Sequence, residues 1–247
     1  MLNRLMDGLL VLCIVFGFLV PGFAQTGMDS RVMEKFKKSF PQIQAETLRK
    51  TDIEGMYEVY IPGRMLYYFP EKDYIFAGSI WTSKGSNLTE MRINEILTEK
   101  VKNIPLEKAL KIGNGKNVVI EFTDPDCPYC RDASKFLSEQ TNITRYVIFV
   151  PLAMHKDAEQ KVRYIFCSKD RGKAYEEAMK GILDGMNYEV CKDEDVEKLL
   201  KEHKQISEAL GINSTPQFWI NGRHVSGADI PLLKKLLGQD KQMPQYK

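Results

Sequence analysis

Residues 121–130 read E-F-T-D-P-D-C-P-Y-C and place two cysteines, Cys127 and Cys130, two residues apart. An apolar run at 117–122 comes first and predicts a buried strand, and residues 131–140 have the apolar spacing of an amphipathic helix. The two thiols are therefore expected at the first turn of a helix, where unpaired backbone N–H groups and the helix dipole stabilise a thiolate. This arrangement favours thiol redox chemistry.

The composition is that of an ordinary globular protein. The chain has 247 residues, of which 43% are hydrophobic and 28% are charged, and this length allows two ordinary domains or one large one. Its 35 basic and 33 acidic residues give a net charge of +2. That balance lacks the basic surface typical of nucleic-acid-binding proteins, so we expect no nucleic-acid partner.

The first 24 residues have the parts of a secretory signal peptide. Arg4 gives a positively charged start, residues 9–20 form an apolar run, and Gly22 and Ala24 are small residues at the cleavage-site positions. The apolar run is shorter than the roughly 20 residues that a membrane-spanning helix needs. We therefore favour export with cleavage after about Ala24, with an uncleaved anchor as the alternative.

Export leaves four cysteines, the two in the motif together with Cys167 and Cys191. An even number in an oxidising compartment favours disulfides. The close spacing of Cys127 and Cys130 makes them the natural redox pair, which leaves Cys167 with Cys191 as a structural staple or, alternatively, a second redox couple. A zinc site is disfavoured because it usually takes a second closely spaced pair. The three histidines have no metal-binding spacing either, so no metal is expected; they are His155, His203 and His224.

Residues 25–85 are expected to form a small antiparallel β domain. A short helix is predicted at 29–38. Four strand-like segments rich in tyrosine, isoleucine, valine and phenylalanine follow at 45–53, 56–61, 64–69 and 74–81. A sheet of this size is marginally stable by itself and has open edges. We therefore expect dimerisation through an edge, giving a homodimer, with packing on the second domain as the alternative.

Residues 86–112 are predicted to form a linker helix, which begins with Asn87 and Glu90 in the spacing of a capping box. Residues 113–247 then alternate strands and helices around the redox motif. They include a helical insertion at about 155–210, and they end in a hairpin and a final helix. The predicted fold class is therefore a mixture of α+β and α/β.

This order of elements resembles the thioredoxin fold, in which a cis-proline lies against the redox cysteines at the position of Thr215-Pro216. The whole arrangement resembles the periplasmic DsbC/DsbG disulfide isomerase family over nearly the whole mature chain. F-T-D before the cysteines is similar to DsbC, and D-P followed by C-P-Y-C is similar to DsbG. The resemblance implies a periplasmic location and a structural disulfide between Cys167 and Cys191.

The resemblance also implies a thiol:disulfide isomerase or oxidoreductase that needs no cofactor. Cys127, which we expect to be exposed, would attack a wrong disulfide in a misoxidised or unfolded periplasmic protein and form a mixed disulfide. A substrate thiol would resolve it, giving isomerisation, or Cys130 would, giving net reduction. Thr215 and Pro216 would bind the substrate backbone like an added strand. A DsbD-like membrane reductant would keep the pair reduced.

Glu121 departs from DsbC, which has an apolar residue here, and matches the buried acid of thioredoxin and DsbA-like oxidants. Burial would favour its protonated form, so Glu121 is a candidate proton relay to Cys130; an ordinary strand-edge glutamate is the alternative. Pro128 and Tyr129 lie between the cysteines, where residues tune the redox poise. Together with Glu121, they leave a dedicated reductase or oxidant as an alternative function. A periplasmic chaperone or binding module with secondary cysteines is a further alternative.

Overall fold

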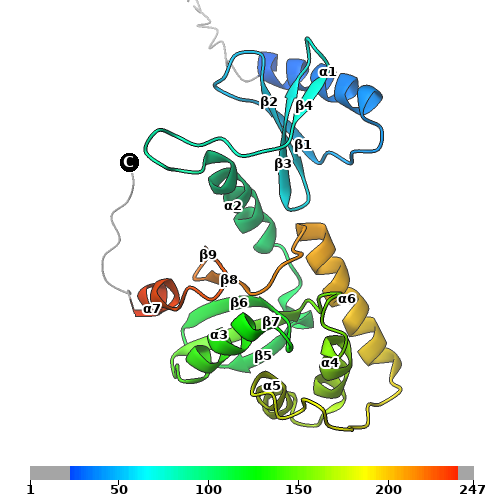
Figure 1. Cartoon of the computed structure of the whole chain (residues 1–247), viewed down its shortest axis with the longest axis vertical. Helices are drawn as coiled ribbons and strands as arrows, with labels where there is room; N and C mark the ends of the chain where they lie inside the picture. The colour runs from blue at the N-terminus through cyan, green and yellow to red at the C-terminus, as the bar shows by residue number, and fades with distance from the viewer. Residues whose placement is uncertain (1–22, 239–247) are drawn as a thin grey trace, which may run out of the picture.

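The structure is a computed structural model that describes the backbone of residues 23–238 and the side chains of residues 30–238. Helix α2 joins two β-sheets, one with the strand order β1-β2-β3-β4 and one with the order β5-β7-β6-β8-β9 (Figure 1). The predicted signal peptide, residues 1–24, lies outside the described residues except for its last two. Between residues 23 and 238, no helix is long and apolar enough to cross a membrane.

The N-terminal sheet is the predicted antiparallel meander, preceded by helix α1 (Phe23–Ser39). Its strands are β1 (Thr47–Lys50), β2 (Tyr57–Ile61), β3 (Arg64–Phe69) and β4 (Tyr74–Phe76). The two inner strands match the prediction closely. The outer strands are shorter than the predicted segments 45–53 and 74–81, with four and three residues. They lie at the open edges, where each has only one neighbouring strand to extend its pairing.

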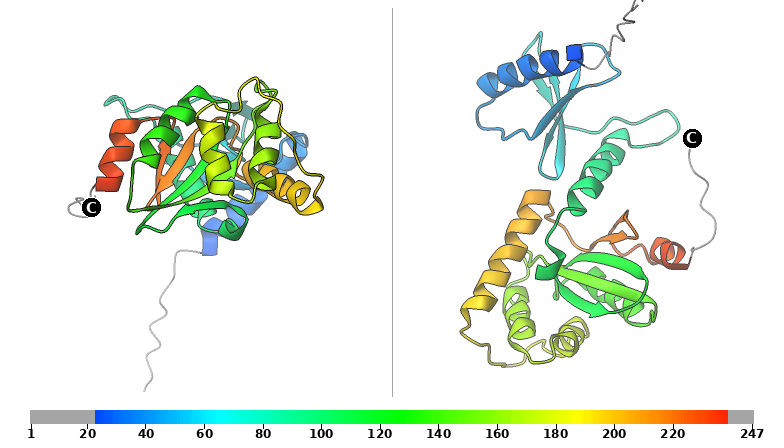
Figure 2. Two further views of the ribbon diagram at one scale, coloured as in Figure 1. Left: turned by 90° about the horizontal axis from the view of Figure 1, so that it is seen from below. Right: turned by 180° about the vertical axis from the view of Figure 1, so that it is seen from behind.

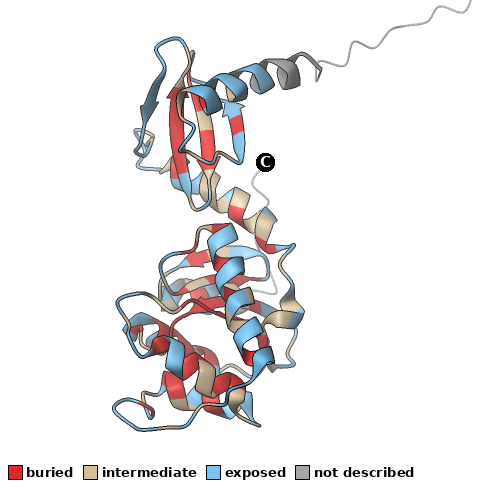
Figure 3. Cartoon of the chain, turned by 90° about the vertical axis from the view of Figure 1, so that its right-hand side faces the viewer, coloured by how far each residue is buried: buried red, intermediate tan, exposed pale blue. Residues whose placement is uncertain are grey.

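Both faces of this small sheet are covered, because alternate residues of a strand point to opposite sides. Val59 and Leu66, which are paired across β2 and β3, pack with Phe36 of α1. On the other face, Tyr60 and its neighbours pack toward Ile93 of α2. Figure 3 shows the resulting buried centre of the sheet between exposed edges. The sheet is therefore held mainly by its own helix and by the linker helix.

The sheet also touches the second part of the molecule directly, at the turn between β2 and β3. A Cβ atom on Gly63 in this turn would lie only 2.3 Å from the carbonyl oxygen of Gly211, at the end of α6. Beside this contact, Lys100 bonds to both carboxylate oxygens of Glu46 and to the carbonyl of Ala209. This small contact agrees with the predicted alternative to dimerisation, in which the sheet packs on the second domain.

Helix α2 (Leu88–Val101) begins as predicted, with Asn87 accepting a hydrogen bond from the N–H of Glu90 at 3.1 Å. It is shorter than the predicted linker helix of residues 86–112. After Pro105 the chain forms a 3-10 turn, η1 (Leu106–Lys108), and then strand β5 (Leu110–Gly113), which pairs antiparallel with β7. Strand β5 was not predicted, because its four residues carry too little alternation to show a period.

The second sheet is built around β6 (Asn117–Thr123), which leads into the cysteine motif. It is parallel to β7 (Ile143–Phe149) and antiparallel to β8 (Gln217–Ile220), which forms a hairpin with β9 (Arg223–Ser226). Helices α3 (Pro128–Ser138) and α7 (Ile230–Gly238) pack on one face, and α2 and α6 pack on the other (Figure 2). The mixed fold class predicted from the sequence is confirmed.

The helical insertion follows β7 and consists of α4 (Ala158–Cys167), α5 (Arg171–Met179) and α6 (Glu194–Leu210). A disulfide joins Cys167 at the end of α4 to Cys191 in the loop before α6, with Cα atoms 5.6 Å apart. The predicted pairing is therefore confirmed. It uses two of the four cysteines that a zinc site would need. Within the described residues, no group of three or more His, Cys, Asp or Glu side chains is placed to hold a metal.

Candidate active site

The two motif cysteines lie where β6 ends and α3 begins. Cys127 is the N-cap of α3, Pro128 is its first helical residue, and Cys130 is in its first turn. The helix starts earlier than the predicted residue 131, because proline is well suited to the first helical position. The N–H of Cys127 donates to the carbonyl of Asp124 at 3.1 Å, and its carbonyl accepts from the N–H of Arg131 at 3.1 Å. Both cysteines are free thiols.

Thr215 and Pro216 are brought to the cysteines by the antiparallel pairing of β8 with β6. The peptide bond between them is cis, as the resemblance implied. The Sγ atom of Cys127 lies 3.5 Å from the carbonyl oxygen of Thr215, to which the thiol can donate. The structure therefore brings together the two sequence-distant parts of the predicted site.

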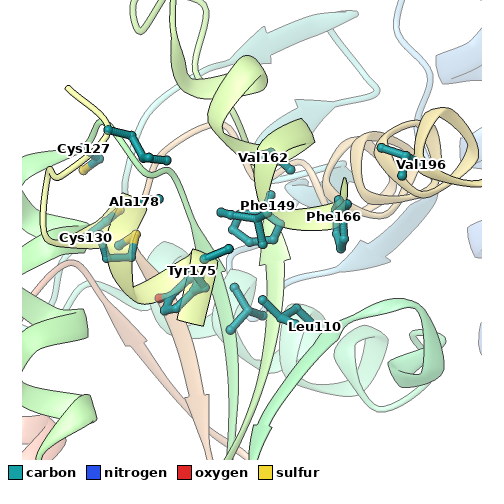
Figure 4. Close-up of a cluster of buried hydrophobic side chains, with 14 residues drawn as sticks. Leu110, Cys127, Cys130, Phe149, Val162, Phe166, Tyr175, Ala178 and Val196 are labelled. Atoms are coloured by element: carbon teal, nitrogen blue, oxygen red, sulfur yellow. The ribbon is translucent and has the colours of Figure 1, made fainter. Parts of the chain in front are cut away.

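Cys127 is not exposed, and that expectation is wrong. Its exposed fraction is 4%, and that of Cys130 is 0%. Both cysteines belong to a buried cluster with residues of the insertion, among them Val162 of α4 and Ala178 of α5 (Figure 4). The insertion and the Thr215 loop pack against the dithiol and leave little of Cys127 exposed. In contrast, Tyr129 between the cysteines is exposed.

Burial raises the pKa of the Cys130 thiol and so disfavours its thiolate. Three groups next to the sulfur act in the opposite direction, the hydroxyls of Thr215 and Thr123 and the backbone of Asp124. Among the described residues, neither hydroxyl has a hydrogen-bond partner, although both oxygens are buried. A Cys130 thiolate would accept hydrogen bonds from both of them.

Glu121 is fully buried in β6, so the alternative of a strand-edge glutamate is wrong. Its carboxylate is paired with Arg145 of β7, whose Nη2 and Nε lie 2.7 and 3.1 Å from Oε2. The hydroxyl of Tyr175 in α5 donates to Oε1 at 2.8 Å and lies 2.7 Å from Arg145 Nη2. None of the hydrogen bonds of Glu121 within the described chain leads to a cysteine. The relay to Cys130 therefore stays a prediction.

Arg145 is a residue that the sequence analysis missed. Its side chain is almost completely buried, and Glu121 and Tyr175 raise its pKa against the effect of burial, which is the largest influence and lowers it. The signal was present in the sequence, since Arg145 is the one charged residue in the apolar run I-T-R-Y-V-I-F of β7. A charge inside a buried strand requires a partner.

The acidic loop before Cys127 is also held by a network that the sequence analysis missed. The carboxylate of Asp124 is fully buried; its Oδ1 accepts from the N–H of Asp126 at 2.7 Å. Its Oδ2 accepts from the N–H of Leu152 at 2.7 Å and lies 2.9 Å from Nδ1 of His155. The backbone and the side chain of Asp124 thus fix the turn from which Cys127 follows.

Asp126, the residue next to Cys127, lies in an ion-pair network with Arg131, Lys161 and Asp184. Arg131 Nη2 is 3.2 Å from Asp126, and its guanidinium binds Asp184 through two hydrogen bonds of 2.7 and 2.8 Å. Lys161 of α4, which is 3% exposed, contacts both carboxylates. Arg131 Nε also donates to the carbonyl of Pro125 at 2.7 Å.

Comparison with known proteins gives two family matches. The family described as disulfide bond isomerase protein N-terminal domain matches residues 23–90, and the family described as thioredoxin-like domain matches residues 106–231. The thiol:disulfide interchange protein DsbC of Escherichia coli K12 is 25% identical over 92% of this chain and 94% of that protein. The probable DsbC of Bordetella pertussis is 28% identical over 80% of this chain and 69% of that protein.

Solved structures with a similar backbone include two disulfide exchange proteins. A disulfide interchange protein from Neisseria gonorrhoeae is 32% identical, covers 57% of this chain and 100% of its own, and has a TM-score of 0.48. The thiol-disulfide exchange protein alpha-DsbA2 from Wolbachia pipientis is 14% identical, covers 60% and 97%, and has a TM-score of 0.49.

Proposed function

Because this chain belongs to the DsbC-type family of thioredoxin-like thiol:disulfide interchange proteins, we propose that it is an exported protein that isomerises or reduces non-native disulfides of periplasmic proteins. The observation that carries the proposal is the position of the dithiol. Cys127 caps α3 and faces the carbonyl of Thr215 next to the cis-proline, while Cys130 lies fully buried behind it. We therefore assign Cys127 as the attacking thiol and Cys130 as the resolving thiol, because Cys127 keeps a small exposed fraction and lies beside the cis-proline.

The reaction starts when the thiolate of Cys127 attacks one sulfur of a client disulfide. The client S–S bond breaks, its other sulfur leaves as a thiolate and takes up a proton, and a mixed disulfide with Cys127 forms. If a client thiolate then attacks the client sulfur of this bond, Cys127 is released and no net electrons are transferred. If Cys130 attacks Sγ of Cys127 instead, the client leaves reduced and a Cys127–Cys130 disulfide remains. A DsbD-like membrane reductant would return two electrons to it.

The client backbone would bind at Thr215 and Pro216. The carbonyl of Thr215 is the group that the thiol of Cys127 contacts, and Thr215 and Pro216 lie just before β8, which is paired with β6 and β9 from Gln217 onward. An extended client segment would pair there like an added strand. The exposed ring of Tyr129 lies in the motif itself and would contact apolar client side chains.

Refolding of a ribonuclease with scrambled disulfides tests the proposal. The mature protein in a glutathione buffer should restore ribonuclease activity, and the Cys127–Cys130 pair should be reduced in the periplasm of an expressing bacterium. A pair that is fully oxidised in cells would contradict the isomerase and would favour the alternative of a dedicated oxidant. A protein that prevents aggregation equally well with both cysteines replaced by serine would instead be a chaperone.

The N-terminal sheet supports a homodimer. Its edge strand β4 carries exposed apolar side chains, and Tyr74, Phe76 and nearby Trp81 have exposed fractions of 67%, 49% and 60%. An exposed apolar edge strand is a template for pairing with another chain. In the proposed assembly, residues 25–85 form the dimerisation domain, and two dithiols face a shared cleft for one client.

Charged substitutions on β4 test the dimer. The double variant Tyr74→Glu and Phe76→Glu should turn a dimer into a monomer in sedimentation equilibrium, because the two carboxylates would face their counterparts across the paired edges. Ile53→Glu is the matched control, since Ile53 is an exposed apolar residue in the loop between β1 and β2, away from β4. A wild-type protein that is monomeric at micromolar concentration, or a control that dissociates equally, would contradict this interface.

A further inference from the structure

The loop before the attacking cysteine is acidic, which is unfavourable for a thiolate. Asp124 and Asp126 both precede Cys127, and Asp126 is its direct neighbour. A carboxylate close to a thiol disfavours the thiolate and so slows every reaction in which the thiol attacks. Each of these two carboxylates therefore needs partners that offset its unfavourable effect on the Cys127 thiolate.

The charge of Asp124 is compensated locally. Its two oxygens accept hydrogen bonds from the backbone N–H groups of Asp126 and Leu152, and one of them also contacts the His155 ring. These partners come from the loop itself and from the segment after β7. They do not reach Asp126, whose carboxylate needs partners of its own.

The charge of Asp126 is compensated by the helical insertion and by α3. Lys161 reaches it from α4, and Arg131 reaches it from the first turn of α3. Burial lowers the pKa of the Lys161 ammonium, but its hydrogen bonds to Asp126 and Asp184 outweigh burial and raise it. A nearly buried lysine held between two carboxylates is therefore a charged group at neutral pH.

Asp184, in the loop after α5, competes with Asp126 for the same two cations. Its carboxylate binds the guanidinium of Arg131 through two hydrogen bonds and also contacts Lys161. The hydrogen bond from Arg131, helped by Lys161, holds the pKa of the Asp184 carboxyl at about 2. The network thus contains two cations and two carboxylates, and only Asp126 is adjacent to Cys127.

We propose that Lys161 and Arg131 are positioning residues for Cys127. The two cations hold and neutralise the Asp126 carboxylate, so that the Cys127 thiolate forms beside an acidic loop. Asp184 limits this effect because it binds the same two cations. This inference rests on the proposed role of Cys127 as the attacking thiol. The network also ties the loop before Cys127 to α3, to α4 and to the loop after α5. Four other titratable groups lie near the network and Cys127. Cys130 packs with Cys127, and His155 contacts Asp124. Burial raises the pKa of Tyr188, and the charge of Lys161 acts to lower it.

The pH profile of Cys127 alkylation tests this inference. Iodoacetamide is reacted with the full mature chain carrying Cys130→Ser, so that Cys127 is the one free thiol. Lys161→Met, which keeps the length of the side chain and removes its charge, should slow alkylation at neutral pH about three- to tenfold and move the profile up by about half to one pH unit. The difference should shrink in high salt.

Two further variants separate charge from structure. Asp184→Asn leaves both cations to Asp126, so it should move the profile down, opposite to Lys161→Met. Adding Asp126→Asn to Lys161→Met should restore the wild-type profile, because the unpaired carboxylate is then gone. Superimposable profiles for Lys161→Met and wild type would overturn the inference, as would a defect that Asp126→Asn does not repair. If Lys161→Met does not fold, Asp184→Asn alone still tests the inference, because an unchanged profile for Asp184→Asn would overturn it.

Alkylation distinguishes this inference from the proposed function. The readout needs only a reactive thiol, so it succeeds or fails whether or not the protein isomerises disulfides. Altered profiles without any isomerase activity would leave the network intact and contradict the proposed function alone. Full isomerase activity with unchanged profiles would contradict the network alone.

Discussion

Replacing Cys127 with serine is expected to abolish disulfide interchange, with a loss of about a thousandfold or more in refolding rate. The hydroxyl of serine is a far weaker nucleophile than a thiolate, and no second thiol takes over. Cys130 is fully buried, burial raises its pKa, and Cys167 and Cys191 are already joined to each other. The measurement is the rate at which scrambled ribonuclease regains activity in a glutathione buffer.

Cys130→Ser should give a different result, because it removes only the resolving thiol. Cys127 still attacks, so a mixed disulfide with the client should accumulate and be visible on a non-reducing gel. Client thiols still resolve part of it, so isomerisation should persist while net reduction is lost. If Cys130→Ser abolished interchange and Cys127→Ser spared it, the assignment of the two thiols would be reversed.

The parts of the molecule that the sequence predicted are those with local signals. The inner strands of the meander, the cap at Asn87 and the C-terminal hairpin are each decided by neighbouring residues. The redox pair belongs to the same group, since two cysteines at a helix start need no distant residue to be recognised. The resemblance to a family implied the cis-proline and the second disulfide, whose pairing the spacing also favoured, and the structure shows both.

The burial of Cys127 and the charge networks could not be predicted, because they depend on packing between distant segments. Lys161 reads as one polar residue of an amphipathic helix, and only the fold of the insertion brings it to Asp126. Arg145 is the intermediate case. Its position in an apolar strand signals a buried partner, but the identity of that partner, Glu121, depends on the parallel register of β6 and β7.

Breaking the ion pair between Arg145 and Glu121 is expected to have the second large effect, a loss of stability. Arg145→Met should lower the free energy of unfolding by about 3–5 kcal/mol, because it leaves the Glu121 carboxylate buried without its cation. Both side chains are almost completely buried, so solvent cannot replace the lost partner. Urea denaturation at neutral pH measures the change. The hydrogen bond from Tyr175 to Glu121 remains in the variant. The loss of unfolding free energy should therefore be smaller than for a carboxylate without any partner.

The pH dependence of this loss identifies its cause. An unpaired buried carboxylate binds a proton more readily in the folded state than in the unfolded state, so the stability of Arg145→Met should fall as pH rises from mildly acidic to neutral. Replacing both partners, Glu121→Leu with Arg145→Met, should recover most of the loss, since no charge is left unpaired. A double variant as unstable as Arg145→Met, with no pH dependence, would show that lost packing is the cause.

Glu121→Gln separates the structural role of this carboxylate from the predicted relay. Glutamine can still accept a hydrogen bond from Arg145, although the guanidinium then lacks its counter-charge, so some stability should be lost. If Glu121 also passes a proton to Cys130, the resolving step should slow and its pH profile should change at temperatures where the variant is folded. Unchanged exchange rates would end the relay hypothesis. The buried acid would then serve to hold Arg145, Tyr175 and the sheet beneath the dithiol in one fixed arrangement.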